Sequence, residues 1–119
     1  MFKLYQRPNA RLPALLEDLL GFAATGHQRA IDAAIFMLQD LYRAERPSEC
    51  IFARKLQGLP IWELKPHVRG GIVGGLRIYF YMQNDGRLVL LNAELKEGTS
   101  PGHALREAVL ITSAALRNH

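Results

Sequence analysis

Two alternating runs decide the fold of this chain: LRIYFYM at residues 76–82 and LVLLNAELK at residues 88–96, joined across Asp85-Gly86. Asp-Gly between alternating apolar runs is a strong hairpin signal, because a type I′ turn needs positive φ at both central residues. With these two residues as the loop, Asn84 pairs with Arg87. The apolar pairs of the expected register are Met82–Val89, Phe80–Leu91, Ile78–Ala93 and Leu76–Leu95. The sequence therefore predicts a hairpin with one face in the core.

The other face of the predicted hairpin carries polar side chains. Its cross-strand pairs are Arg77–Glu94, Tyr79–Asn92 and Tyr81–Leu90, and Lys96 lies just beyond them. We expect this face to be open and to carry the function.

Length and composition indicate one globular domain over residues 1–119, with 49% hydrophobic and 22% charged residues. A net charge of +4 favours an anionic partner such as nucleic acid. The single cysteine, Cys50, excludes an internal disulfide and is expected to be a loop or strand-edge thiol. Four scattered histidines predict no metal site. Without a signal peptide or an apolar run of about 20 residues, the protein is expected to be cytoplasmic and not membrane-bound.

Hydrophobic spacing predicts the helices. A short strand over residues 2–5 ends before Pro8, and a helical pattern begins near Leu12. Thr25-Gly26-His27-Gln28 is typical of a capping box, which opens a second helix that ends before Pro47. Ser100 as cap and Pro101 at the first helical position predict the last helix. The expected buried stripes are Leu12, Leu15, Leu16, Leu19, Leu20 and Ala23 in the first helix, Ile31, Ala34, Ile35, Leu38, Leu41 and Tyr42 in the second, and Leu105, Ala108, Val109, Thr112 and Leu116 in the last.

Short strands at residues 51–56 and 61–65 precede a glycine-rich connection over residues 69–75. This connection lacks the GK[ST] ending of a phosphate-binding loop, so we expect a flexible link between strands. The expected fold is α+β: a small antiparallel sheet backed by an N-terminal helical hairpin, with a C-terminal helix, in the order β-α-α-β-β-β-α.

Six segments resemble, in the same order, the HigB-like, phage-derived branch of the RelE/ParE toxins. They are Lys55-Leu56, Trp62-Glu63-Leu64-Lys65, the glycine-rich connection, residues 75–81, residues 89–93 and the helix start at Lys96…Thr99-Ser100-Pro101. The resemblance covers residue 31 to the C-terminus. It implies the toxin of a type II toxin–antitoxin pair, an endoribonuclease that cleaves mRNA on the ribosome without a metal or other cofactor. Its implied partner is an antitoxin, often a helix-turn-helix protein.

By position, the resemblance implies that Arg77, Lys65 and Lys96 are catalytic. Cleavage by the 2′-hydroxyl needs a base, cations around the phosphorane and an acid for the leaving 5′-oxygen. Arg77 suits the phosphate because its planar fork binds two oxygens, and the two lysines are expected to transfer protons. The further candidates are Tyr79 and Tyr81 for base stacking, Lys55, Arg69 and Asn92 for RNA contacts, and Glu63, Glu94 or His103 as acid or base.

Three features depart from the family pattern. Glu97 stands in place of a second basic residue, His119 ends the chain in place of a tyrosine, and Glu94 is placed to pair with Arg77. A plain cross-strand pair of this kind contributes a few tenths to about 1 kcal/mol and needs no catalytic role. The alternatives are a non-cleaving, ParE-like inhibitor of gyrase, a phage-derived relative that binds an anion without nuclease activity, or a decayed domain. The sequence does not indicate an oligomeric state.

Overall fold

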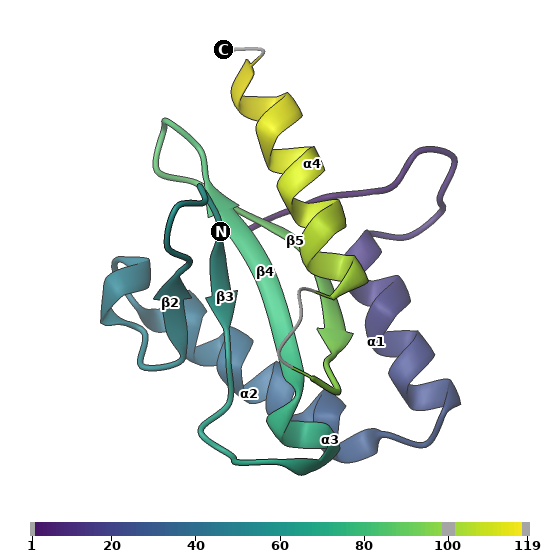
Figure 1. Cartoon of the computed structure of the whole chain (residues 1–119). Coiled ribbons are helices and arrows are strands. Elements are labelled where there is room, and N and C mark those ends of the chain that lie inside the picture. Colours follow the sequence, from purple (N-terminus) through teal and green to yellow (C-terminus); the bar gives the residue numbers. More distant parts are fainter. Residues whose placement is uncertain (1, 99–101, 118–119) are drawn as a thin grey trace.

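A computed structural model describes residues 2–98 and 102–117, and Figure 1 shows three layers. Helices α1 (Ala14–Ala24) and α2 (Gln28–Arg43) cover one face of a five-stranded sheet, and α4 (His103–Arg117) lies on the other face. The predicted α+β class, with a helical hairpin before the sheet and a helix after it, is confirmed.

The sheet has the strand order β1-β5-β4-β3-β2. Its strands are β1 (Lys3–Leu4), β2 (Ala53–Lys55), β3 (Trp62–Leu64), β4 (Leu76–Met82) and β5 (Leu88–Leu95). The sheet is mixed rather than purely antiparallel, because β1 pairs in parallel with β5.

Four strands follow the helical hairpin, one in each of the four ranges expected from the sequence, although the order β-α-α-β-β-β-α counts only three of them. Two short helices also occur, the 3₁₀ helix η1 (Pro47–Glu49) and the single turn α3 (Gly71–Gly74). The glycine-rich connection therefore contains an ordered helical turn.

The register of the β4–β5 hairpin is as predicted in its inner half, the half farther from the turn, where Leu76 pairs with Leu95 and Ile78 with Ala93. The predicted register of the outer half is wrong by one residue, because Phe80 pairs with Leu90 and leaves Leu91 as a β-bulge. The predicted two-residue loop is also wrong. The Gln83 N–H donates to the Arg87 carbonyl (2.8 Å) and the Gly86 N–H to the Gln83 carbonyl (2.9 Å). The loop thus has three residues, ending on Gly86 with φ 86°.

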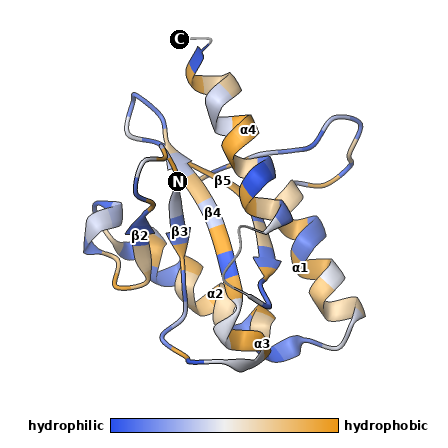
Figure 2. Cartoon of the chain, in the orientation of Figure 1, coloured by the Kyte–Doolittle hydropathy of each residue, from blue (hydrophilic) through white to orange (hydrophobic). Residues whose placement is uncertain are grey.

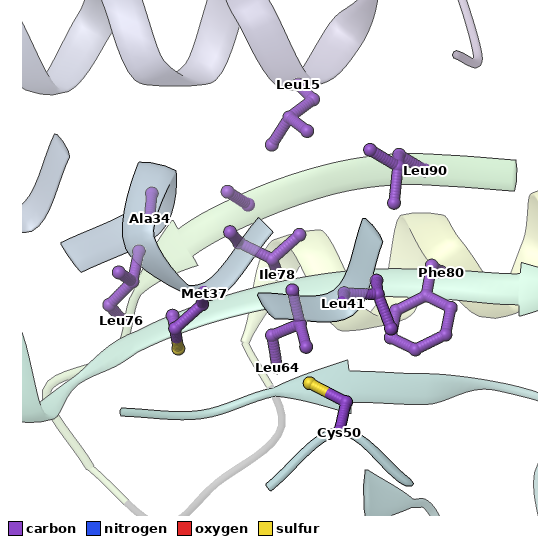
Figure 3. Packing of buried hydrophobic residues seen from close by; sticks show 11 residues of the cluster. Leu15, Ala34, Met37, Leu41, Cys50, Leu64, Leu76, Ile78, Phe80 and Leu90 are labelled. Carbon is purple, nitrogen blue, oxygen red and sulfur yellow. The ribbon is translucent and has the colours of Figure 1, made fainter. Parts of the chain in front are cut away.

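The apolar residues of β5 alternate between two cores, one on each face of the sheet. The first core lies between the sheet and the α1–α2 hairpin (Figure 3), and its buried residues are Leu15, Ala34, Met37, Leu41, Cys50, Leu64, Leu76, Ile78, Phe80, Leu90 and Ala93. The second lies between the sheet and α4, and its buried residues are Ile61, Tyr79, Tyr81, Val89, Leu91, Ala104 and Ala108. Much of the face that was expected to be open is therefore covered by α4.

The buried stripe of α2 is rotated from the predicted one. Ala34 and Leu41 are buried as expected, whereas Ile35 and Tyr42 are 47% and 60% exposed, and Met37 is buried in their place. A tyrosine and an isoleucine are thus left on the outer surface of this helix.

In α1 and α4, only part of the predicted buried stripe is buried. Leu15 in α1 and Ala108 and Thr112 in α4 are buried, but Leu116 is exposed, as are three predicted leucines of the first helix, Leu12, Leu16 and Leu20. The predicted Ser100 cap lies outside the described residues.

The predicted capping box is wrong. The Thr25 hydroxyl donates to the Gly21 and Phe22 carbonyls at the end of α1, and the N-cap of α2 is His27.

Cys50 lies in a loop, as predicted. It is buried after η1, and its Sγ donates to Asp40 Oδ2 over 3.2 Å. Burial raises the pKa of this thiol, which favours its protonated form.

Candidate functional site

The candidate site lies where β4 begins and β5 ends, close to α3. There Arg77 pairs with Glu94 across the strands, and the Lys96 N–H donates to the Gly75 carbonyl over 2.7 Å. Hydrophilic colour marks the end of β5 and interrupts the hydrophobic colour of β4 (Figure 2). The register thus brings one guanidinium, one ammonium and one carboxylate to the same end of the sheet.

Arg77 is held in place by the backbone. Its Nη1 donates to the carbonyls of Gly74 (2.9 Å) and Leu76 (2.8 Å), and only 14% of its side chain is exposed. The carbonyl of Gly74 is free for this bond because α3 ends there. Within residues 2–98 and 102–117, Nη2 donates no hydrogen bond. This nitrogen is therefore the one with donors left for an anion.

The carboxylate beside Arg77 is Glu63 rather than the expected Glu94. Arg77 Nε lies 3.9 Å from Glu63 Oε2, and Arg54 Nη2 lies 2.5 Å from Glu63 Oε1. The Glu63 side chain is 6% exposed, so it is a buried carboxylate between two guanidinium groups. With both oxygens directed at cations, Glu63 is poorly placed to act as a general base.

Glu94 is bound to a buried phenol. Tyr79 OH donates to Glu94 Oε2 over 2.6 Å, and Tyr79 is 0% exposed. Burial and this hydrogen bond raise the pKa of Tyr79 well above its usual range, so the phenol stays protonated. A Cβ placed on Gly102 would lie 1.7 Å from Glu94 Oε1, so the backbone that leads into α4 passes directly over this carboxylate.

Arg77 and Lys96 line one hollow of about 610 Å³. Its other walls are Gly70, Gly71, Ile72, Gly74, Gly75, Leu95, Glu97 and Gly98. The end of β5 approaches closely because residue 75 is a glycine, whose Cβ would lie only 2.1 Å from the Lys96 carbonyl oxygen. Among the described residues, the Lys96 ammonium has no ion-pair partner.

Three predicted RNA-binding residues are not available to RNA. Tyr79 and Asn92 are 0% exposed and Tyr81 is 7% exposed, because α4 packs over this part of the sheet. Asn92 Nδ2 donates instead to the Ala104 carbonyl (2.9 Å) and to Glu107 Oε1 (2.6 Å). The expectation of an open face with stacking tyrosines is therefore wrong.

The remaining predicted residues do not line the hollow. Lys65 follows β3 directly, where the β3–β4 register continues to Arg77, but it does not line the hollow. Lys55 pairs with Trp62, whose ring stacks on Phe80, so Lys55 lies on the opposite face of β2 from Arg54. Arg69 and His103 are exposed, Arg69 next to the glycines of the hollow and His103 in the first turn of α4.

Two arginines of structural importance were not predicted. Arg54 was missed although its pairing with Glu63 follows from the β2–β3 register. Arg7 had no signal in the sequence, since it reaches Glu107 of α4 (Nε–Oε2 2.8 Å) and Asp18 of α1 (3.2 Å) from far along the chain. Asp18 in turn accepts the Ala93 N–H (2.9 Å). Arg7 therefore joins α4, α1 and the sheet.

No family model matches this chain, and a search of curated proteins finds no match. Among residues 2–98 and 102–117, no three His, Cys, Asp or Glu side chains gather as a metal site. No helix in the same residues is long and apolar enough to cross a membrane.

Proposed function

We propose that this chain is a RelE/ParE-type toxin that cleaves mRNA on the ribosome in the cytoplasm and is silenced by a cognate antitoxin. The observation that carries the proposal is the hollow lined by both Arg77 and Lys96, with Glu94 across the strands from Arg77. A guanidinium and an ammonium that share one recess form a site for a phosphate group.

The proposed reaction is a transfer of phosphate within the RNA chain. The 2′-oxygen attacks phosphorus and the bond to the 5′-oxygen breaks, which leaves a 2′,3′-cyclic phosphate and a 5′-hydroxyl. Arg77 Nη2 donates to the phosphate oxygens as negative charge develops on them. Glu94 accepts the proton of the 2′-hydroxyl on Oε1, the oxygen that the Tyr79 phenol does not bind, and Lys96 supplies a proton to the leaving 5′-oxygen. Lys65 adds positive charge beside Arg77, and no metal takes part.

A second candidate function is anion binding without cleavage. Glu63 lies 3.9 Å from Arg77, and Glu97 lines the hollow next to Lys96. These carboxylates reduce the positive charge of the recess, and Arg77 Nη1 is already bound to two carbonyls. In this second function the site binds a phosphate group and does not stabilise a phosphorane.

The test compares Arg77→Ala with Arg87→Ala, because both arginines belong to the same hairpin and Arg87 lies at its turn, far from the hollow. We expect induced wild-type protein and Arg87→Ala to arrest growth and to create new 5′ ends in cellular mRNA. Loss of one phosphate-binding donor should lower cleavage by about 100-fold or more. Primer extension after induction measures both effects.

Lys96→Ala provides a variant that does not depend on the structural role of Arg77. The Lys96 ammonium makes no described ion pair, so the fold should persist while cleavage falls. If Arg77→Ala remains fully toxic, the catalytic assignment is wrong. If the wild type arrests growth while RNA stays intact, the non-cleaving function replaces it.

A further inference from the structure

The outer face of α2 carries an exposed repeat that has no role in the proposed site. Arg29, Asp32, Phe36, Gln39 and Arg43 are all exposed and are spaced 3, 4, 3 and 4 residues apart. This spacing places the five residues in one stripe along the helix. We call these five residues the α2 seam.

Apolar side chains flank the α2 seam. Ile35 and Tyr42, seven residues apart, are 47% and 60% exposed on one side of it, and Phe36 in the seam is 63% exposed. The apolar surface continues beyond the helix, because the Phe36 ring lies 5.8 Å from that of Phe52, and Phe2 lies 5.6 Å from Tyr42. Adjoining exposed aromatic and aliphatic groups of this kind mark an interaction surface.

We propose that a second copy of this chain covers the α2 seam, with the two α2 helices antiparallel about a two-fold axis. Phe36 and Gln39 have the same midpoint along the helix as Asp32 and Arg43. An axis through that midpoint places Asp32 opposite Arg43 of the second copy, and Arg43 opposite Asp32 of the second copy. A two-fold interface requires this reciprocity.

The charges of the seam are free for these contacts. Neither Asp32 nor Arg43 has an ion-pair partner among the described residues. Asp32 Oδ1 accepts from Gln28 Nε2 over 3.0 Å, which leaves Oδ2 for a guanidinium. Asp32 and Arg43 therefore present opposite charges at equal distances from the proposed axis, as pairing between two copies demands.

The shape of the surface fits the same pairing. A hollow of about 320 Å³ adjoins the seam and is lined by Phe2, Ile35, Leu38, Gln39, Tyr42 and Arg43. The two-fold axis sets Phe36 of one copy opposite Gln39 of the other, at the edge of this hollow. The volume is ample for an aromatic ring, since cavities of about 150 Å³ take up benzene. Each copy then supplies one protruding ring and one recess.

The test measures the mass of the full chain by sedimentation over a range of concentrations. We expect the wild type to dimerise, and Asp32→Arg and Arg43→Asp each to weaken the dimer by about tenfold or more, since each variant creates two like-charge contacts. The double variant Asp32→Arg/Arg43→Asp should restore dimerisation. Leu110→Arg, at a 72% exposed leucine of α4, is the control and should leave the dimer intact.

Circular dichroism establishes that each variant is folded. A wild type that stays monomeric at high concentration overturns the proposal, and a double variant as weak as the single ones overturns the antiparallel register. Dissociation by Leu110→Arg alone would place the interface on α4 and would equally overturn the proposal.

Discussion

Gly75 is the residue that determines how closely the end of β5 approaches the start of β4. A Cβ at this position would lie 2.1 Å from the Lys96 carbonyl oxygen, which is part of the backbone and cannot rotate away. In contrast, Gly21 in α1 has no heavy atom within 4 Å of its Cβ position. The two glycines thus occupy their positions for different reasons.

We predict opposite effects of an alanine at these two glycines. Gly75→Ala should lower the free energy of unfolding by about 1–3 kcal/mol or more, because the strand ends must separate. Gly21→Ala should raise it by about 0.5–1 kcal/mol, because alanine favours the helix and space is available. Urea denaturation measures both, and a Gly75→Ala protein as stable as the wild type would contradict the close approach.

Among the residues of the candidate site, the sequence predicted only some positions and contacts. Arg77 and Lys96 could be brought together from strand register alone, because their positions depend on the inner half of the hairpin. The partner of Arg77 could not, because Glu63 reaches it from β3 with a side-chain conformation that periodicity does not determine. Long, flexible side chains choose among several neighbours once the fold has formed.

Among the elements, α4 depends on a polar attachment as well as on its apolar stripe. The Glu107 carboxylate of α4 accepts hydrogen bonds from Arg7 Nε (2.8 Å), Arg7 Nη2 (2.9 Å) and Asn92 Nδ2 (2.6 Å). The hydrogen bond from Arg7, followed by that from Asn92, holds the pKa of the Glu107 carboxyl below its usual range. Folding therefore stabilises the charged form of Glu107.

A pH-dependent effect of Glu107→Gln follows. At neutral pH the variant should be less stable than the wild type by about 1.5–3 kcal/mol, the contribution of hydrogen bonds to a charged group. This contribution is fully present above the ordinary glutamate pKa and is lost as the pH falls through the lowered pKa of the folded state. Urea unfolding of both proteins from pH 7 to pH 3 should therefore show the difference shrinking in acid.

Glu17→Gln is the matched control for that measurement. Glu17 also faces Arg7, at 3.4 Å, but its side chain is 39% exposed. Glu17→Gln should lower the free energy of unfolding by no more than about 1 kcal/mol, since water screens exposed ion pairs. An equal loss in both variants, or a difference for Glu107→Gln that grows in acid, would contradict the attachment through Glu107.

The helices show why periodicity alone predicts an element better than its buried face. The extent of α2 agrees with its spacing and with Pro47, because local backbone preferences decide where a helix begins and ends. Its buried stripe is set by packing on the sheet, which selects Met37 over Ile35. A helix with apolar residues around much of its circumference offers two possible stripes, and only tertiary contacts select one.

For the whole molecule, the α+β architecture could be predicted from the sequence, but its three layers could not. The hairpin, the helical pair and the final helix all have local signals, so the class could be read from the sequence. The run Leu88-Val89-Leu90-Leu91 was the available sign that both faces of β5 are buried, because strict alternation leaves no place for four apolar residues in a row. Alternation along the strand sends the residues of this run to both cores, and the bulge at Leu91 determines which residues enter which core.

The same bulge makes the length of β5 as important as its composition. Residues 88–90 reach their present sides only because Leu91 adds one position to the strand. Deletion of Leu91 would preserve almost every side chain and yet exchange the environments of Leu88, Val89 and Leu90, or force the turn to slide by one residue along its partner. An insertion or deletion in this segment should therefore destabilise the fold far more than a substitution of one aliphatic residue by another. Related sequences should keep the length of the segment more strictly than the identity of its residues.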